Sequence, residues 1–328
     1  MNPDSASKAL RHAEAALDFY PEWSLVRFVD IRENAIFEIE SQDARRAVLR
    51  IHRPDYQTAS AIRSELEWMR YLCASGMRVP EPILNRRDSP LTHTPSGATV
   101  SVLSWLPGTS LSEFRDGQFK DASELTRICR RLGCELARLH NLSDRFSKSA
   151  GFTRWSWDSL GFLGKTPHWG RFWEHPSLST DQRRLMTKFR RAVRNKLQSW
   201  DAMGLEFGLI HADALPENVL VDGEDVYLID FDDCGYGYRM YELAVAVWGL
   251  RSLPGHSALT AALHSGYCAA RPLPDWQWKT LEGFIVVRNL LCLGWIADRA
   301  EIGDTDERFV KHTQWLESEG VRWLESNS

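Results

Sequence analysis

A short segment near the middle of the chain concentrates residues whose types and spacing could do chemistry. His211, Asp213 and Asn218 lie in HADALPEN, and Asp230 follows in LIDFDD. Apolar runs flank them: GLIH precedes the loop, NVLV follows it, and DVYLIDF comes after an Asp-Gly turn. The pattern predicts strand, loop, strand, turn and strand. The polar groups would therefore sit in a loop and at strand ends, where a rigid hairpin keeps them fixed and accessible.

These residue types are the set that phosphoryl transfer requires. A carboxylate such as Asp213 can orient and deprotonate an acceptor hydroxyl, while Asn218 and Asp230 can hold the Mg²⁺ that neutralises phosphate charge. His211 could brace the loop through a hydrogen bond to its backbone. Asp and Asn also favour loops for reasons unrelated to catalysis. The spacing, followed by an aspartate at a strand end, favours the phosphotransferase interpretation.

The elements before this segment must position it, and they predict a small antiparallel sheet. Residues 24–31, 35–41 and 46–52 alternate apolar and polar side chains in three short runs, as a meander of strands would. A capped amphipathic helix over 58–76 follows. The strand pattern at 99–108 ends in Pro and Gly, which suit a hinge.

Helical patterns dominate the rest of the chain. The predicted fold class is therefore α+β, with an N-terminal lobe over 1–104, a helical C-terminal lobe over 105–328 and a boundary near Trp105. The predicted helices of the second lobe cover residues 120–142, 180–202, 239–251, 255–270, 275–299 and 305–325.

Composition excludes several classes of function. The net charge of −4, with basic and acidic residues interleaved, shows no basic stripe of the kind that nucleic-acid binding requires. Six cysteines without a CxxC pair indicate reduced thiols, and the first twenty residues do not resemble a signal peptide, so we expect a cytoplasmic protein. The apolar run at 281–297 carries Arg288 and Asn289 at its centre, which favours a buried core helix over a membrane span.

HADALPEN followed by LIDFDD resembles the HxDxxxxN and IDF elements of the aminoglycoside phosphotransferase and choline kinase-like family, relatives of protein kinases. The order of elements is similar over roughly residues 24 to 300. Ala212 departs from the Gly that metabolite kinases more often have there. LRIHRP and IRSELEWM look most like the homoserine kinase-like and stress-response kinase branch. The resemblance implies a two-lobed protein-kinase-like fold that uses ATP and Mg²⁺.

The resemblance also implies a nucleotide site in the first lobe. Arg50 stands at the family's lysine position, with Glu65 as its candidate partner, although a solvent-facing Arg50 and a solvated Glu65 are the plain alternatives. The loop between the first two strands has no glycine, so Asn34, Ala35 or both are the candidate phosphate neighbours, unless Asn34 is only a turn residue. By resemblance alone, Ser104 and Leu106 would present backbone groups to an adenine edge.

Two features favour a cationic acceptor. Asp232 and Asp233 follow the predicted metal aspartate, and the segment 155–173 is rich in tryptophan, including Trp157 and Trp169. Aromatic faces and carboxylates attract ammonium groups. The alternatives are that the tryptophans pack between helices and that Asp233 caps a helix or turn.

Further polar residues receive structural interpretations. Glu242 either orders the catalytic loop from the start of its helix or is a solvated first-turn carboxylate, and both remain open. His140 is interpreted as a C-terminal helix cap. His168 and His175 have no further ligands nearby, so no structural metal is expected there.

Three functions are consistent with these patterns. The leading one is an ATP- and Mg²⁺-dependent phosphotransferase acting on the hydroxyl of a small, possibly cationic metabolite: an amino alcohol, an aminoglycoside or a homoserine-like compound. The second is a protein Ser/Thr kinase of the stress-response type. The third is a nucleotide-binding pseudokinase or scaffold, which the intact Asp213, Asn218 and Asp230 argue against. Neither nucleic acid nor membrane is expected as a partner, and the sequence does not fix the oligomeric state.

Overall fold

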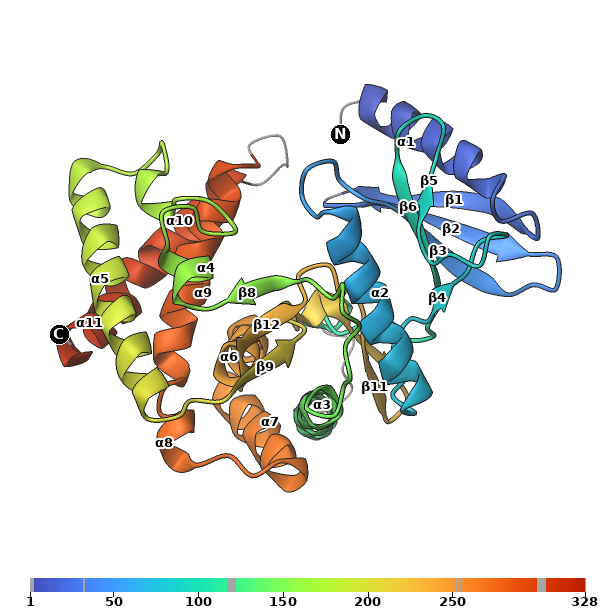
Figure 1. Ribbon diagram of the computed structural model, residues 1–328. Coiled ribbons are helices and arrows are strands. Elements are labelled where there is room, and N and C mark those ends of the chain that lie inside the picture. The colour runs from blue at the N-terminus through green and yellow to red at the C-terminus, as the bar shows by residue number, and fades with distance from the viewer. Residues whose placement is uncertain are drawn as a thin grey trace. The chain divides into compact units, whose positions relative to one another are not determined.

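The protein is described by a computed structural model in which the chain divides into two compact units (Figure 1). Unit 1 comprises Met1–Gly108, Arg145–Arg154 and Tyr227–Asp232; unit 2 comprises Thr109–Asp144, Trp155–Val226 and Asp233–Ser328. The described residues are 3–31, 33–116, 122–251, 253, 255–299 and 305–327.

Unit 1 is built on the predicted antiparallel sheet. Its strand order is β1–β2–β3–β6–β4, and β5 pairs with β6. The strands are β1 (Trp23–Ile31), β2 (Ala35–Ser41), β3 (Arg46–Ile51), β4 (Pro82–Ile83), β5 (Thr92–His93) and β6 (Thr99–Ser104). Helix α1 (Pro3–Leu17) packs its small residues Ala9, Ala13 and Ala16 into the core formed with Phe37 and Leu49 of the sheet. The predicted meander is thereby confirmed.

Helix α2 (Ala59–Ala74) forms where its sequence signals place it. The Thr58 side chain accepts a hydrogen bond from the Ala61 amide at 3.2 Å, which satisfies a donor that the first turn leaves open. Ile62 and Leu66 lie on the buried face. Gly76, just beyond the helix, has φ +80°, a conformation that glycine adopts without a Cβ clash.

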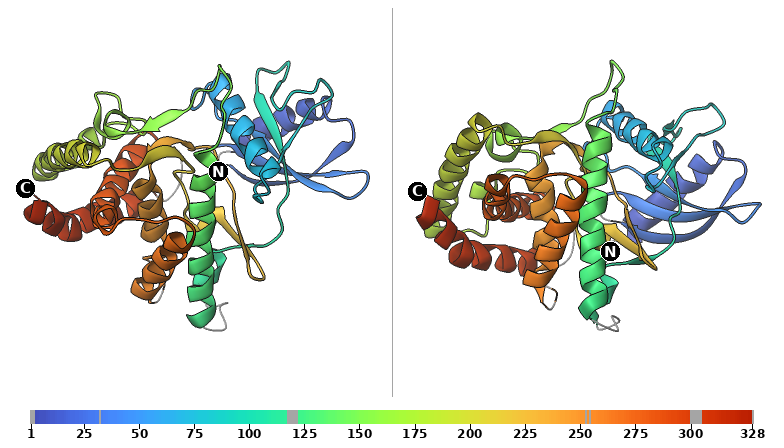
Figure 2. Two further views of the ribbon diagram at one scale, coloured as in Figure 1. Left: turned by 60° about the horizontal axis from the view of Figure 1, so that its bottom comes forward. Right: turned by 90° about the horizontal axis from the view of Figure 1, so that it is seen from below.

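Unit 2 is mainly helical, as predicted. Its helices are α3 (Ala122–Ser143), α4 (Ser159–Leu163), α5 (Thr180–Ala202), α6 (Arg239–Leu250), α7 (His256–Ala270), α8 (Asp275–Trp278), α9 (Leu281–Ala297), α10 (Thr305–Trp315) and α11 (Val321–Asn327), with a π-turn at Leu316–Gly320. Figure 2 shows α3 and α7 side by side. Gly133 and Gly266 allow this approach, because a Cβ on either would lie 2.0 or 1.9 Å from a carbonyl oxygen of the facing helix.

Unit 2 also contains short strands. Strand β12 (Gly235–Tyr238) pairs in parallel with β8 (Trp155–Trp157) and antiparallel with β9 (Phe207–Ile210). Strand β10 (Val219–Asp222) pairs with β7 (Thr109–Ser110), and the chain passes from unit 2 into unit 1 within β11 (Asp225–Leu228). The predicted order of strand, loop, strand, turn and strand is confirmed.

Two of the predicted helices differ in detail. The helix expected over 275–299 is broken into α8 and α9 by a turn, and the one expected over 305–325 contains the π-turn. The stretch Asp275–Ala297 is long and apolar enough to span a membrane by length and composition, but 78% of its most apolar window is buried inside the protein. A buried core helix, as predicted, accounts for this apolar run.

Candidate active site

The loop after β9 holds the predicted catalytic residues together. The Asn218 amide nitrogen donates to both the Asp213 backbone carbonyl at 2.9 Å and its Oδ2 at 2.7 Å. His211 Nδ1 accepts a hydrogen bond from the Asp213 amide at 3.3 Å, so its predicted bracing contact is confirmed. A 3₁₀ turn at Pro216–Asn218 brings the carboxamide back over the loop. Asp213 retains 19% side-chain exposure, which leaves its carboxylate within reach of a small molecule.

Glu242 of α6 binds the backbone of this loop, a contact that we call the Glu242 clamp. It is fully buried and accepts hydrogen bonds from the His211 amide at 2.5 Å and the Ala212 amide at 3.2 Å. Burial raises the pKa of its carboxyl to about 7, while the His211 and Ala212 amides act in the opposite direction. Glu242 therefore orders the loop, and the alternative of a solvated first-turn carboxylate is wrong.

The backbone at Ala212 is strained. Its φ is +68°, a left-handed conformation in which a Cβ crowds the following carbonyl oxygen. Asp230 shares this property with φ +62°. Non-glycine residues keep such a conformation only where the surroundings enforce it, and they cluster at functional sites. The departure at Ala212 noted in the sequence thus falls on a position that glycine would occupy without strain.

A buried arginine of α9 joins the catalytic loop. Arg288 Nη2 lies 2.6 Å from Asp213 Oδ1, so the two oxygens of Asp213 contact two different side chains, Arg288 and Asn218. The Arg288 side chain is only 5% exposed. Sequence reasoning used Arg288 only against a membrane span. A charged residue inside an otherwise apolar helix was the signal that could have identified it.

In unit 1, the predicted partner of Arg50 is confirmed. Arg50 Nη2 lies 2.6 Å from Glu65 Oε1, and both side chains are buried. Burial alone would lower the pKa of Arg50, but the carboxylates of Glu65, Asp232 and Asp230 raise it, so its charge is retained. The solvent-facing alternatives for Arg50 and Glu65 are therefore wrong. Their role toward a nucleotide stays a prediction.

Arg154 completes this cluster and was missed in the sequence. Its Nη1 lies 3.9 Å from Glu65 Oε2 and donates to the Ala61 carbonyl at 3.1 Å. Its Nη2 donates to the Asp232 carbonyl. Arg154 belongs to a short segment that returns to unit 1 from elsewhere in the chain, and no local pattern marks such a return.

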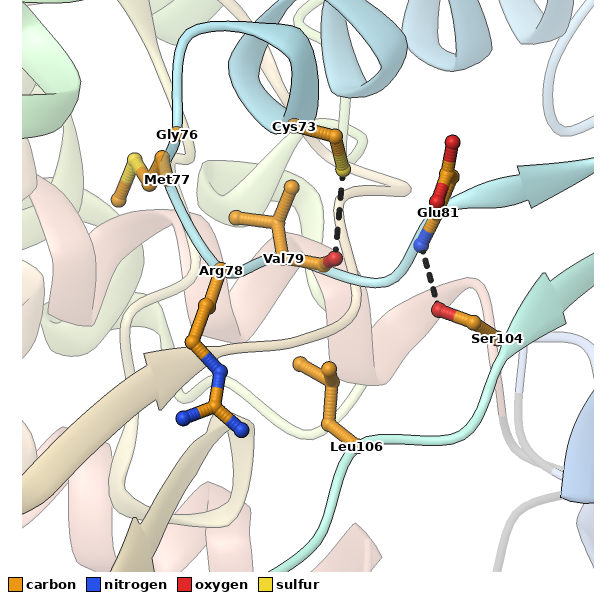
Figure 3. Close-up of a pocket in the computed structure, with 8 residues that line it drawn as sticks. All are labelled: Cys73, Gly76, Met77, Arg78, Val79, Glu81, Ser104 and Leu106. Atoms are coloured by element: carbon orange, nitrogen blue, oxygen red, sulfur yellow. Dashed lines mark hydrogen bonds between the residues drawn. The ribbon is translucent and has the colours of Figure 1, made fainter.

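The other residues predicted for the nucleotide have structural contacts. Asn34 Oδ1 accepts a hydrogen bond from the Arg53 amide at 3.2 Å. The Ser104 amide donates to the Glu81 carbonyl, and the Ser104 hydroxyl accepts a hydrogen bond from the Glu81 amide, both at 2.8 Å. Ser104 and Leu106 line a cavity of about 280 Å³, where Figure 3 shows the Leu106 side chain directed toward Val79. Their contact with adenine stays a prediction.

The tryptophans predicted for the acceptor are packed inside unit 2. Trp157 is fully buried against Trp169 and Tyr241, with ring centroids 5.3 and 5.8 Å away, and its Nε1 donates to the Asp233 carbonyl at 2.8 Å. The guanidinium of Arg288 lies 4.8 Å from the Trp169 ring centroid. These contacts match the packing alternative, so the structure gives the cationic pocket no support from either ring. The acceptor role of Asp233 stays a prediction, as does that of Asp232, which lies in unit 1.

His140 requires a correction. It was interpreted as a C-terminal cap, but α3 continues to Ser143 and His140 is buried within it. Its Nδ1 lies 2.7 Å from the Tyr267 hydroxyl. The imidazole therefore fastens α3 to α7.

The predicted metal ligands offer suitable atoms. Because the Asn218 nitrogen is held by Asp213, its carboxamide oxygen is the atom left for a cation, and Asp230 offers a carboxylate. Oxygen ligands of this kind are those that Mg²⁺ prefers. Within the described residues, no group of three His, Cys, Asp or Glu side chains could hold a metal by itself. That Asn218 and Asp230 share one ion stays a prediction.

Comparison with known proteins accords with this geometry. Residues 25–279 match the profile described as the phosphotransferase enzyme family. An amicoumacin kinase from Bacillus subtilis (strain 168) is 24% identical over 293 residues, which are 86% of this chain and 82% of that protein. A homoserine kinase from Phenylobacterium zucineum (strain HLK1) is 30% identical over 258 residues, 76% of this chain and 72% of that protein.

Solved structures confirm the predicted two-lobed, protein-kinase-like fold. A microcompartment-associated aminopropanol kinase aligns with a TM-score of 0.81 and 27% identity, covering 97% of this chain and 98% of that one. An amicoumacin kinase in complex with AMP-PNP, Ca²⁺ and Ami aligns with a TM-score of 0.78 and 20% identity, covering 97% and 96%.

Proposed function

Because the chain belongs to the phosphotransferase enzyme family, we propose that it transfers the γ-phosphate of ATP, with Mg²⁺, to a hydroxyl of a small metabolite. The observation that carries this proposal is the partly exposed Asp213 carboxylate, fixed at both oxygens by Asn218 and Arg288. A carboxylate held in this way is preorganised to receive an acceptor hydroxyl.

The acceptor oxygen forms a bond to the γ-phosphorus as the bond from that phosphorus to the β–γ bridging oxygen breaks, and ADP leaves. The acceptor proton passes to the Asp213 carboxylate. Arg288 and Asn218 keep that carboxylate in one orientation, and His211 with Glu242 fixes the backbone on which it stands.

The charged groups of unit 1 would serve the nucleotide. Arg50, held by Glu65, keeps its positive charge in a buried setting and would bind the phosphates. Mg²⁺ held by Asn218 and Asp230 would neutralise phosphate charge when bound. Positioning and charge neutralisation, with no covalent intermediate on the protein, would supply catalysis.

The acceptor is proposed to be a small molecule. Relatives of this chain are named homoserine kinase, amicoumacin kinase and aminopropanol kinase, which supports small hydroxylated acceptors over a protein Ser or Thr. The six cysteines are free thiols, which supports a reducing compartment and hence the cytoplasm.

The test is Mg²⁺-dependent transfer from γ-labelled ATP into a panel of amino alcohols, aminoglycosides, hydroxy amino acids and a generic protein substrate. Asp213→Ala is the inactive control, and Asp222→Ala, in the exposed turn of the same hairpin, is the matched one. We expect transfer to a small molecule that only Asp213→Ala abolishes. Transfer to protein alone would support a protein kinase, and nucleotide binding without any transfer would leave either an acceptor outside the panel or a pseudokinase.

A further inference from the structure

The Arg288 guanidinium has donors that the protein leaves unused. Nη2 contacts Asp213, but Nε and Nη1 are buried and, apart from an interaction with Tyr241, have no hydrogen-bond partner within the part of the chain that is described. A guanidinium carries five N–H donors, and a buried donor without an acceptor is costly. Such a donor in a folded protein calls for a ligand or another specific explanation.

The Tyr241 hydroxyl faces the same place. Tyr241 of α6 is fully buried, and its hydroxyl lies near enough to Arg288 to interact with it electrostatically. The two side chains interact with each other, and beyond this contact neither the hydroxyl nor Arg288 Nε or Nη1 has a hydrogen-bond partner in the described structure. Two donor-bearing side chains, both more than nine-tenths buried, thus converge beside the catalytic carboxylate.

Further cations lie near Arg288. Arg288 acts electrostatically on Cys292 and His312. Arg308 and Lys311 of α10 act on the same two side chains. Burial, followed by these cations, lowers the pKa of His312 to about 3, so His312 is neutral and adds no charge. Asp213 is a carboxylate that acts on both Arg288 and Cys292. Together with Arg288, these cations give the region a positive field, which favours an anionic ligand.

We infer that Arg288, together with the Tyr241 hydroxyl, binds a carboxylate of the acceptor. The anion must belong to the acceptor because Arg288 touches Asp213, the residue that receives the acceptor hydroxyl. The substrate class is then a small hydroxy acid, such as a hydroxy amino acid. This inference rests on the proposed function and selects one acceptor class within it.

The experiment uses three matched pairs of acceptors that differ only by a carboxylate. They are L-homoserine and 3-aminopropan-1-ol, L-serine and 2-aminoethanol, and L-threonine and 1-aminopropan-2-ol. In the wild-type protein we expect kcat/KM for the carboxylated member of the accepted pair to exceed that of its partner by about 10²-fold or more, as for a site built to bind a polar group. A preference for the carboxylate-free member, or none, would overturn the inference, and this comparison needs no variant to fold.

Variants then assign the preference to its residues. Arg288→Gln and Tyr241→Phe should lower kcat/KM for the carboxylated member about tenfold or more beyond any loss for its partner, and Arg288→Lys should restore part of the difference. Arg251→Gln, a surface arginine of unit 2 that pairs with Glu282, is the matched control. Equal losses for both members would show that Arg288 only positions Asp213 or contacts the transferred phosphoryl group, and would refute carboxylate binding.

Thermal stabilisation by each acceptor separates this inference from the proposed function. Stabilisation of the wild type by carboxylated members alone, without phosphate transfer, would support the carboxylate site and reject the transferase. Phosphate transfer at equal kcat/KM to both members of a pair would support the transferase and reject the carboxylate site. If none of the six compounds stabilises the protein and none is phosphorylated, the carboxylate site is overturned.

Discussion

The catalytic loop of unit 2 and the Arg50 cluster of unit 1 hold their functional groups by different means. In the loop, one buried carboxylate, Glu242, fixes two backbone amides, and the side chain of Asp213 is then set by Asn218 and Arg288. In the cluster, Arg50 is held by the charge of Glu65 and by the field of Asp232 and Asp230.

The difference predicts how each region fails. A backbone held by amide hydrogen bonds keeps its shape when one functional side chain is replaced. A buried ion pair that loses one partner leaves the other charge uncompensated in a medium that solvates it poorly. Substitutions in the loop should therefore mainly lower activity, and substitutions in the cluster should mainly lower stability.

The largest expected effect is the loss of activity in Asp213→Ala. Removing the group that receives the acceptor proton should lower kcat by roughly 10²–10⁴-fold. The loop backbone should keep its shape, because the Glu242 clamp does not involve the Asp213 side chain, although the loss of the carboxylate beside buried Arg288 should also lower stability. Initial rates of phosphate transfer measure the activity, and circular dichroism measures the folding. Asp222→Ala is the control in both measurements. A variant that unfolds instead would remove the contrast between the two regions.

The next effect is on the stability of unit 1. Arg50→Met removes the nearer of the two cations at buried Glu65 and leaves Arg154 at 3.9 Å, and we expect the free energy of unfolding to fall by up to about 3–5 kcal/mol. The double variant Arg50→Met/Glu65→Leu should recover much of this loss. Urea unfolding of the two single variants and the double variant gives the coupling energy. Additive losses would show that the pair is not a unit.

Glu242 provides a pH-dependent test of the clamp. The pKa of its carboxyl in the folded state is about 7, above the ordinary value of 4.5, so between these values the folded state binds more protons than the unfolded state. The stability that Glu242 contributes is fully present below pH 4.5 and is lost as the pH rises through 7. We expect unfolding free energy to fall over this window by about 1–3 kcal/mol more in the wild type than in Glu242→Gln.

Denaturant unfolding at several pH values between 4 and 8 measures this difference. Glu282→Gln, on the exposed first turn of α9, is the control and should follow the wild type. Parallel pH curves for wild type and Glu242→Gln would contradict the assignment of a raised pKa to Glu242.

The smallest expected effect concerns the strained backbone. Ala212→Gly should raise the free energy of unfolding by up to about 1 kcal/mol, since glycine accepts φ +68° without a Cβ clash. Ala192→Gly in the interior of α5 should lower it by a similar amount. Thermal unfolding of the pair gives opposite shifts if strain is present at Ala212. Shifts of the same sign would show that the clamp does not hold a strained loop.

The sequence predicted those features that depend on neighbouring residues. Alternating strands, a cap at the start of the helix over 58–76 and the spacing of Asp213 and Asn218 are local patterns, and the structure reproduces them. The partner of Arg50 was predicted from the family resemblance, which implies a helix glutamate beside the cation of the strand. The family resemblance supplied the fold of the whole chain.

Contacts between distant parts of the chain were not predictable. Arg288 and Asp213 are 75 residues apart in the sequence, and Arg154 and Asp232 are 78 residues apart. The tryptophan-rich segment was ambiguous for another reason. An aromatic face serves packing and cation binding equally well, and only burial, as at Trp157, distinguishes them.

The discontinuity of unit 1 bears on how the protein is made. Its sheet and α2 are synthesised within Met1–Gly108, but Arg154 and Asp232 arrive much later in the chain. A nascent chain that has just completed β6 therefore exposes the Ala61 carbonyl and Glu65 without the arginine that later contacts them. Unit 1 can reach its final form only after residue 232 has left the ribosome, and Met1–Gly108 alone should not behave as an independent folding domain.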